Sequence, residues 1–181
     1  MEIAHNTLIE SCKKQSHKAQ MEVYRLFYKS VYNTCFRILR RQDEAEDAMQ
    51  DSFIKAFDKI KAYNSDTSFT AWIKRIAINT AIDALRKKKV ALVELDERIA
   101  LAEEDIDDFN ENMLKVEAIK AGINNLSEGY RLVLTLHLIE GYDNDEIAEI
   151  LNITPSTVRS QYIRGKKRLL EILTAKEQQY G

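Results

Sequence analysis

Glycine, proline and cysteine are scarce in this chain of 181 residues, which has five glycines, one proline and two cysteines. So few glycines and a single proline leave long stretches without residues that interrupt helices, which is typical of an all-α protein. Two cysteines cannot form a disulfide framework, and neither has histidine or cysteine neighbours at the spacing of a zinc site. We therefore expect Cys12 and Cys35 to be packing residues.

The chain also lacks the apolar runs of a membrane protein and the motifs of common enzymes. No stretch approaches the roughly 18 apolar residues that a transmembrane helix requires, and residues 1–5 do not begin a signal peptide. The three histidines are scattered, and there is no glycine-rich phosphate loop and no nucleophile motif. These absences predict a cytoplasmic protein that is not an enzyme and that needs neither a cofactor nor a metal.

The net charge of −2 conceals a strong asymmetry along the chain. Residues 1–89 carry 17 lysines and arginines against 11 acids, residues 90–117 carry 2 against 10, and residues 118–181 carry 8 against 8. Local fields of this kind, rather than the net charge, steer charged partners. We predict two small helical bundles, residues 1–89 and 118–181, joined by an acidic flexible linker, residues 90–117.

Apolar side chains recur at helical spacing in three segments of the front domain, residues 19–41, 43–60 and 69–86. A polar loop, residues 61–68, separates the second segment from the third. Helices with such short connections form one small bundle. The outward side of the second segment carries Asp47, Gln50, Asp51 and Lys55.

The third segment has a polar side opposite its apolar side and ends in the basic residues 86–89. Basic residues at a helix C-terminus can simply complement the helix dipole. The preceding loop favours a second role, because an aromatic ring and hydrogen-bonding groups beside a basic helix can hold an unstacked base over a phosphate backbone. The polar side contains Arg75, Asn79, Arg86 and either Ile82 or Asp83. The loop offers an exposed Tyr63 with Asn64, Ser65 and Thr67.

In the rear of the chain, a helix resumes near residue 113, and a second helix is predicted over residues 128–139 with Ser127 as its N-cap. Residues 143–168 then predict two short helices with a sharp turn between them. Local chemistry explains both helix starts and the turn. Asp143 and Glu146 form a capping box, Asn152 suits a left-handed residue at the end of the first helix, and Thr154 and Pro155 begin the second.

The charge changes sign across this turn, because acids precede it and five basic residues follow it without an intervening acid. On a wheel of about 100° per residue, the second helix has an apolar and a polar side. A solvated amphipathic helix would show the same pattern. The caps, the turn, the hydroxyl residues at the helix start and the later basic residues together indicate a DNA-reading helix-turn-helix. The apolar side is Val158, Tyr162, Gly165 and Leu169, and the polar side is Ser156, Ser160, Arg164 and Lys167.

Three blocks of the sequence, residues 43–57, 69–86 and 126–168, occur in an order and spacing that resemble the sigma-70 family of bacterial RNA polymerase specificity factors. The resemblance is to the compact extracytoplasmic-function (ECF) group and covers nearly the whole chain. It departs from the family at Asn152, where glycine is usual, at Ser127, where proline is common, and at Tyr162, where leucine often packs.

The resemblance implies a factor that binds core RNA polymerase and promoter DNA, with an anti-sigma factor as a further partner and no membrane insertion. The acidic linker would pass through the polymerase cleft and imitate the charge of RNA. Core polymerase would be bound by Asp47, Gln50, Asp51 and Phe53. The −10 element would be read by Tyr63, Asn64, Ser65, Arg75, Asn79, Asp83 and Arg86. The −35 element would be read by Ser156, Thr157, Arg159, Ser160, Arg164, Lys167 and Arg168.

A stand-alone helix-turn-helix regulator, with a front bundle that senses a ligand or dimerises, is the alternative interpretation. Such a front domain would lack the polar surface of residues 47–51 and the basic third helix, and this chain has both. The sequence therefore favours the sigma factor.

Overall fold

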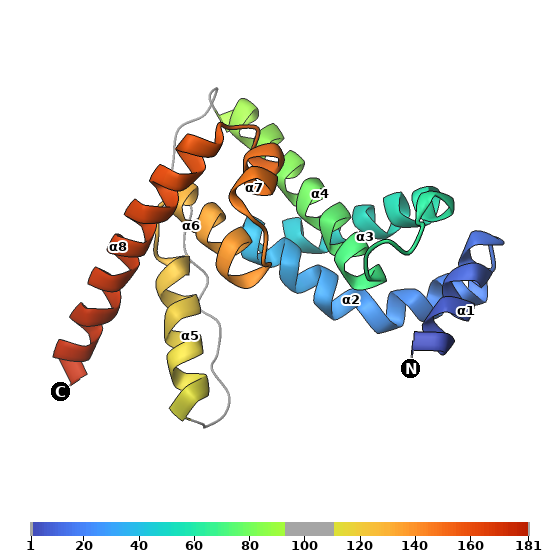
Figure 1. Ribbon diagram of the computed structural model, residues 1–181, viewed down its shortest axis with the longest axis horizontal. Coiled ribbons are helices and arrows are strands. Elements are labelled where there is room, and N and C mark those ends of the chain that lie inside the picture. The colour runs from blue at the N-terminus through green and yellow to red at the C-terminus, as the bar shows by residue number, and fades with distance from the viewer. Residues whose placement is uncertain (1, 93–110, 181) are drawn as a thin grey trace. The chain divides into compact units, whose positions relative to one another are not determined.

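A computed structural model describes the backbone of residues 2–92 and 111–180, in which every regular element is a helix (Figure 1). The helices form two compact units, Met1–Ala102 and Glu103–Gly181. The prediction of an all-α protein with two helical groups is confirmed. The acidic residues 103–108 of the predicted linker lie outside the described residues. Within the described ranges, no helix has the length and apolarity needed to cross a membrane.

The first unit is built on three long helices that pack against one another. A shorter helix, which the sequence analysis did not predict, precedes them, and a 3₁₀ turn follows the second long helix. The last helix continues to Leu92, three residues into the range predicted as linker. The elements are α1 (Glu2–Lys13), α2 (His17–Leu39), α3 (Gln42–Lys59), η1 (Ile60–Ala62) and α4 (Phe69–Leu92).

The boundary between α2 and α3 is fixed by local interactions. Arg40 takes a left-handed conformation, φ 63°, and its amide donates to the carbonyl of Phe36, which closes α2. Arg41 then donates to both carboxylate oxygens of Asp43, at 3.1 and 2.7 Å. This hydrogen bond lowers the pKa of Asp43 to about 2. The carboxylate is therefore charged at neutral pH in the first turn of α3, where it complements the helix dipole.

Both cysteines are free and fully buried in the first unit, with an exposure of 0%. Cys35 lies on α2 with its sulfur 3.9 Å from the carbonyl oxygen of Ala77 on α4. Burial raises the pKa of Cys12, so its thiol stays protonated and unreactive at neutral pH. The prediction that these two residues serve packing is confirmed.

The second unit contains four helices and a π-helical turn around its own core. Ile123, Leu126, Leu134 and Leu169 meet in a buried cluster. The unit's first described helix begins at Glu111, close to the predicted start near residue 113. Its elements are α5 (Glu111–Asn124), α6 (Glu128–Leu134), η2 (Thr135–Ile139), α7 (Asn144–Leu151) and α8 (Pro155–Tyr180).

Two details of the second unit bear on its rigidity. Ser127 precedes α6 as predicted, but its side chain makes no capping hydrogen bond. α6 and α8 approach each other closely at Gly165, where a Cβ atom would lie 3.2 Å from the Cβ of Tyr130. The absence of a side chain at Gly165 therefore sets the separation of these two helices.

Candidate functional surfaces

The outward side of α3 forms a continuous stripe of exposed side chains. Asp47, Gln50 and Asp51 are exposed as predicted, and they lie three and four positions apart. Ile54 completes the stripe one turn further along and is 60% exposed. Ile54 was not among the predicted residues, although its position seven residues after Asp47 indicates the same side of the helix. Ile54 adds apolar area to this otherwise polar stripe.

Phe53 does not belong to this stripe, so its assignment to the polymerase-binding surface was wrong. Its side chain is 3% exposed. The ring packs against Tyr24, with centroids 4.8 Å apart, and lies 6.0 Å from the ring of Phe57. A bulky aromatic side chain at this position is held by core packing. Phe53 therefore supports α3 from inside the bundle.

The polar side of α4 is present and resolves the alternative left open by the sequence. Ile82 is 3% exposed, whereas Asp83 is exposed and therefore belongs to the polar side. Asn79 and Arg86 are also exposed, and Arg75 is half-buried. Asp83 lies 3.6 Å from Arg86, so this surface presents both a donor and an acceptor group along one helix.

Part of the basic C-terminal end of α4 stabilises the first unit. Lys88 forms an ion pair of 2.7 Å with Glu44 of α3, and both side chains are about three-quarters buried. Lys55 of α3 donates to the hydroxyl of Thr80 of α4 at 3.1 Å. These two bonds join α4 to α3, while Arg86 and Lys87 are exposed.

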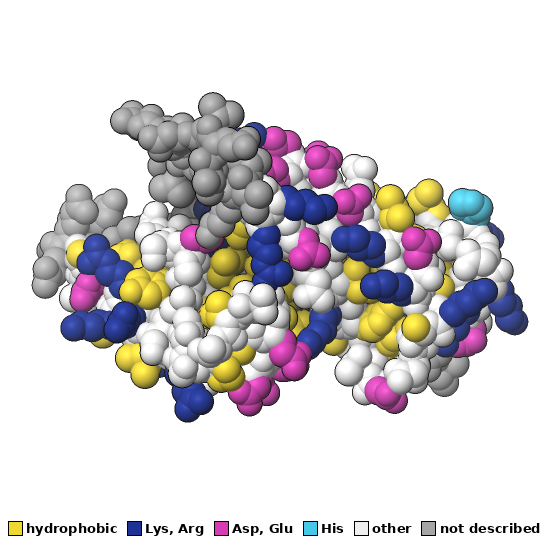
Figure 2. Space-filling view, turned by 90° about the horizontal axis from the view of Figure 1, so that it is seen from above, with side chains coloured by type: hydrophobic (Ala, Val, Ile, Leu, Met, Phe, Trp, Pro, Cys, Tyr) yellow, Lys and Arg dark blue, Asp and Glu magenta, His cyan; other side chains and the backbone are white. Residues whose placement is uncertain are grey.

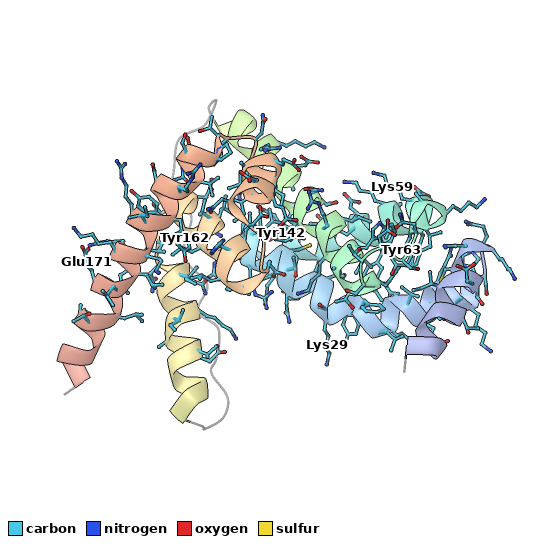
Figure 3. The ribbon with its side chains drawn as sticks, viewed as in Figure 1. Lys29, Lys59, Tyr63, Tyr142, Tyr162 and Glu171 are labelled. Carbon is cyan, nitrogen blue, oxygen red and sulfur yellow. The ribbon has the colours of Figure 1, made fainter. Side chains whose placement is uncertain are left out.

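Tyr63, which Figure 3 labels, is 5% exposed, so the expectation of an exposed aromatic ring in the loop was wrong. The ring packs against Phe69 and Trp72, with centroids 5.4 and 5.3 Å away. Its hydroxyl donates to the carbonyl of Thr67 at 2.8 Å, which satisfies the polar end of the side chain. The ammonium of Lys13 on α1 lies 6.0 Å from the ring centroid. Tyr63 therefore anchors the loop and does not present its ring to solvent.

The neighbouring loop residues are exposed as predicted. Asn64 contacts Asp66 through its side-chain amide, and the amide of Asp66 donates back to Asn64 at 3.3 Å. Ser65, between them, has a positive φ of 67°. This local turn presents the polar groups of Asn64 and Ser65 at the surface.

The helix-turn-helix has the geometry that the sequence predicts. The Asp143 carboxylate accepts from the amides of Asp145 and Glu146 at 2.9 and 2.8 Å, and Glu146 accepts from the Asp143 amide at 3.0 Å. Asn152 adopts the left-handed conformation, with φ 53° and ψ 50°. The Thr154 hydroxyl accepts from the amide of Thr157 at 3.2 Å, and α8 starts at Pro155. Each of these sequence predictions is confirmed.

Replacing Asn152 with glycine will stabilise the second unit by about 0.5–1 kcal/mol, because an L-residue is strained in the left-handed region and glycine is not. The helix-ending bonds from the Asn152 amide to Ala148 and Glu149 involve backbone atoms only and remain. Thermal unfolding of the variant and the unchanged protein measures the difference. An Asn152→Ala variant serves as the control and should be destabilised; a glycine variant that is less stable than the alanine variant would contradict the argument.

The two sides of α8 are also as predicted. Val158, Gly165 and Leu169 are buried and Tyr162 is half-buried. Ser156, Arg159, Ser160, Arg164, Lys167 and Arg168 are all exposed. Thr157 differs from them, because it is half-buried and its hydroxyl lies 2.8 Å from that of Thr154. Thr157 therefore takes part in the cap of the helix.

Tyr162 lies on α8 and packs against the π-helical turn η2. Its ring meets the ring of His137 edge to face, with centroids 4.6 Å apart, and the ammonium of Lys166 lies 5.3 Å from its centroid. The Nδ1 atom of His137 is in turn 2.9 Å from the carbonyl oxygen of Tyr142, which leads into α7. These contacts connect α8 to the segment before α7.

On the face shown in Figure 2, basic, acidic and apolar side chains are interspersed. The described residues contain no group of three or more histidine, cysteine or acidic side chains arranged to hold a metal. Three surfaces carry the exposed residues that the sequence predicts: the α3 stripe, the α4 polar side with its loop, and the polar side of α8.

Two family models match most of the chain. The family model of sigma-70 region 2 matches residues 23–90, and that of sigma-70 region 4 matches residues 117–169. The ECF RNA polymerase sigma factor SigW of Bacillus subtilis (strain 168) is 31% identical over 180 residues, which cover 93% of this chain and 96% of SigW. The chain belongs to the ECF sigma factors. The stand-alone regulator interpretation is thereby set aside.

A second relative supports membership of this family, and two solved structures have a similar fold. The RNA polymerase sigma factor SigV of the same organism is 30% identical over 166 residues, covering 91% of this chain and 97% of SigV. Sigma factor RpoE of Bartonella quintana, solved with the anti-sigma factor NepR, has a TM-score of 0.60 at 22% identity and covers 85% of this chain and 96% of RpoE. CnrH, solved with the cytosolic domain of CnrY, has a TM-score of 0.56 at 20% identity, covering 93% and 96%. Sigma factors are non-catalytic subunits of RNA polymerase.

Proposed function

We propose that this sigma factor binds core RNA polymerase with the α3 stripe and reads promoter DNA with two separate surfaces. The observation that carries the proposal is the placement of three exposed faces on two separately packed units: Asp47, Gln50 and Asp51 on α3, the polar side of α4, and the polar side of α8. A residue that is exposed and has no role in the core of its unit is available for a partner.

The α3 stripe suits a protein partner because it combines acids with an exposed isoleucine. Asp47 and Asp51 attract a basic surface, and Ile54 adds apolar area that becomes buried on binding. The stripe also needs a rigid base, and Phe53 and Ser52 supply one from the buried side of the same helix. Polymerase binding therefore uses Asp47, Gln50, Asp51 and Ile54.

The α4 surface suits the −10 element, where the DNA must open. Arg75 and Arg86 can contact phosphates, while Asn79 and Asp83 offer hydrogen-bonding groups to bases. Asn64 and Ser65 lie in the adjoining loop as the groups that hold an unstacked base. Tyr63 contributes indirectly, because its buried ring positions the loop.

The α8 surface suits the −35 element. Ser156 and Ser160, at the start of the helix, are small enough for close approach to base edges, and Arg159 and Arg164 can donate two hydrogen bonds to guanine. Thr157 contributes mainly through the helix cap that holds this end of α8.

Division of promoter recognition between two surfaces explains why each one is small. When polymerase holds both units, binding at one element raises the effective concentration at the other. Each unit alone should then bind DNA poorly. We further propose that the factor acts in the cytoplasm and that an anti-sigma factor controls it. The similarity in fold to sigma factor RpoE, which was solved with the anti-sigma factor NepR, supports this proposal.

Reconstitution tests the proposed function. Adding the protein to sigma-free bacterial core polymerase should produce transcripts that start at specific promoters of its own genome, in amounts at least about tenfold above core polymerase alone. Core polymerase with no sigma factor is the control. Binding of the protein to DNA without polymerase, together with no sigma-dependent transcript, would contradict the proposal.

A further inference from the structure

The aromatic contact between His137 and Tyr162 joins the helix with the proposed −35 residues to the turn that precedes α7. The two rings meet edge to face, with centroids 4.6 Å apart, and both side chains are half-buried. Tyr162 lies on α8 between Ser160 and Arg164, two of the residues proposed to read bases. Figure 3 labels Tyr162 and Tyr142, the two residues that His137 contacts. The ring contact therefore lies on the same turn of α8 as the proposed base-reading residues.

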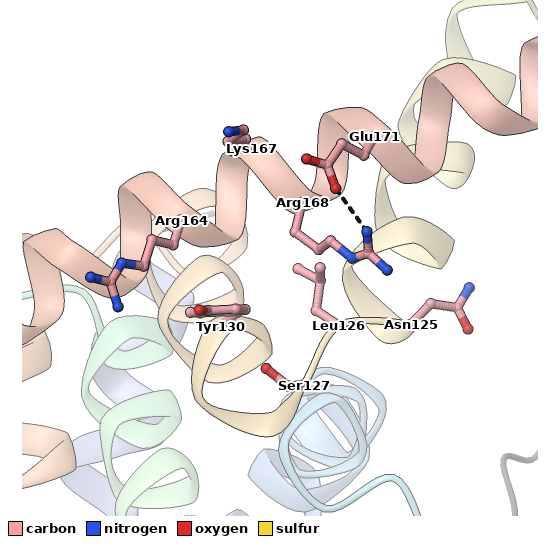
Figure 4. Close-up of a pocket in the computed structure, with 8 residues that line it drawn as sticks. All are labelled: Asn125, Leu126, Ser127, Tyr130, Arg164, Lys167, Arg168 and Glu171. Atoms are coloured by element: carbon pink, nitrogen blue, oxygen red, sulfur yellow. Dashed lines mark hydrogen bonds and ion pairs between the residues drawn. The ribbon is translucent and has the colours of Figure 1, made fainter.

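A second close contact of this part of α8 limits its distance from α6 but does not fix its rotation. Gly165 lies against Tyr130, where a Cβ atom would be 3.2 Å from the Tyr130 Cβ. Figure 4 shows Tyr130 directly beside α8. A glycine has no side chain that could interlock with α6, so this contact offers little resistance when α8 rotates about its own axis. Tyr162, three residues earlier, does have a bulky side chain, and its ring packs against His137.

His137 is itself held in place by the backbone. Its Nδ1 atom donates to the carbonyl oxygen of Tyr142 at 2.9 Å, because a carbonyl can only accept. His137 also lies within the π-helical turn η2, where the amide of Glu140 donates to the carbonyl of Thr135, five residues back, at 3.1 Å. Turns of this kind often occur at functional sites. The imidazole thus has a fixed position from which it can orient the ring of Tyr162.

A small rotation of α8 is enough to change base recognition. Side chains reach about 5–6 Å from a helix axis, so a rotation of about 10° moves their ends by about 1 Å. Hydrogen bonds to base edges need placement within about 0.5 Å. Loss of the His137 contact should therefore lower the discrimination between bases more than the affinity for the phosphate backbone, because phosphate contacts carry no sequence information.

We propose that His137 is a positioning residue for −35 recognition, which sets the rotation of α8 through its ring contact with Tyr162. The inference rests on the proposed DNA-reading role of α8. It is supported by the place of the ring contact, on the turn of α8 that carries Ser160 and Arg164, and by the hydrogen bond that fixes the imidazole. The sequence departs from its family at Tyr162, where leucine often packs, and leucine could not form a ring contact.

The test measures base discrimination by the complete factor bound to core polymerase, on a promoter that the reconstitution identifies. Discrimination is the ratio of the affinity for the intact promoter to the affinity for the same promoter with one −35 base pair exchanged. His137→Asn removes the ring but keeps a side-chain amide that can donate to the Tyr142 carbonyl. This variant should lower the ratio about fivefold, the effect of losing one aromatic contact of ordinary strength.

Two further variants separate the ring from the hydrogen bond and from an unrelated histidine. His137→Phe keeps the ring and removes the donor, so the ratio should stay within about twofold of that of the unchanged factor. His17→Asn is the matched control, because His17 is exposed on α2 in the first unit. The control should leave the ratio unchanged.

Thermal unfolding separates positioning from a merely structural role. Both His137 variants lose one interaction and should unfold at a lower temperature than the unchanged factor, but only His137→Asn should lose discrimination. A ratio that falls in both variants in step with the unfolding temperature would overturn the proposal. An unchanged ratio in His137→Asn would overturn it as well.

A variant on the other side of the contact keeps the proposal testable if His137→Asn does not fold. Tyr162→Leu should also lower the ratio about fivefold. The double variant, His137→Asn with Tyr162→Leu, should lower it no further, because both changes remove the same contact. Two losses that multiply in the double variant would show that the two residues act independently, and the positioning role would then be abandoned.

These outcomes are separate from a failure of the proposed function. If the unchanged factor with core polymerase binds the intact and the exchanged promoters equally, the DNA-reading role of α8 itself fails. If the unchanged factor discriminates and His137→Asn discriminates equally well, only the positioning role of His137 fails.

Discussion

Replacing Asp47 and Asp51 together with arginine will weaken binding to core RNA polymerase about 100-fold, because like charges placed across an interface cost several kcal/mol. Both side chains are exposed on α3 and neither belongs to the core of its unit, so the fold should tolerate the change. The substitutions lie in the first unit, whereas α8 belongs to the second. DNA contacts made by α8 should therefore be unaffected. Competition of the variant with labelled factor for purified core polymerase measures the loss.

The control must carry the same change in charge at a different place. Glu10→Arg with Glu22→Arg provides it, since both acids are exposed and lie on α1 and α2. This double variant should bind core polymerase within about twofold of the unchanged factor, because long-range effects between exposed charges are screened by salt. If the two double variants bind core polymerase equally well, the α3 stripe is not the polymerase-binding surface.

Replacing Gly165 with valine will destabilise the second unit by about 2 kcal/mol, a typical cost of overpacking. A Cβ atom at Gly165 would lie 3.2 Å from the Cβ of Tyr130 and 3.4 Å from the Cδ1 and Cγ of Leu134. The Tyr130 Cβ is attached directly to the backbone of α6 and cannot rotate away, so the two extra methyl groups of valine force α6 and α8 apart. Hydrogen exchange should become faster in α6 and α8 and remain unchanged in α2 and α4.

Ala175→Val is the control for this substitution. Ala175 is exposed on the same helix, so valine there should lower the stability only by its weaker helix propensity, about 0.6 kcal/mol. A smaller substitution, Gly165→Ala, should be nearly neutral, because the gain in helix propensity offsets one tight contact. If Gly165→Val and Ala175→Val accelerate hydrogen exchange equally, the close approach of α6 and α8 does not limit the stability of the unit.

The helix-turn-helix could be predicted residue by residue because its determinants are local. The capping box joins Asp143 to residues two and three positions away, and the cap of α8 joins Thr154 to Thr157. The turn depends only on the conformation of Asn152. Interactions of such short range are encoded in neighbouring residue types, so the chain alone was sufficient to locate them.

The errors arose where distant residues decide the outcome. Tyr63 lies in a polar loop and looked exposed, but Phe69 and Trp72 of the following helix and Lys13 of α1 surround its ring. Phe53 faces the core because Tyr24 of α2 packs on it. Helix α1 escaped prediction for a related reason: 12 residues form a marginal helix alone, and packing on α2 stabilises it.

The family could be identified from the sequence, whereas the direction of single side chains could not. Family membership follows from blocks of sequence, which do not depend on the direction of each side chain. The outward or inward direction of Ile82, Asp83 and Ile54 depends on how α3 and α4 are rotated in the bundle, and this rotation is set by packing across all three long helices. Only the structure fixes it.

Helix α8 is one uninterrupted element of 26 residues, Pro155–Tyr180. Its first part presents the polar side of Ser156 and Ser160, and its later part packs on α5, where Gly122 lies against Leu169 and Leu173. The same helix also packs on α6 and α7. One continuous helix therefore joins the packing around α5 to the end of α8 that carries Ser156 and Ser160.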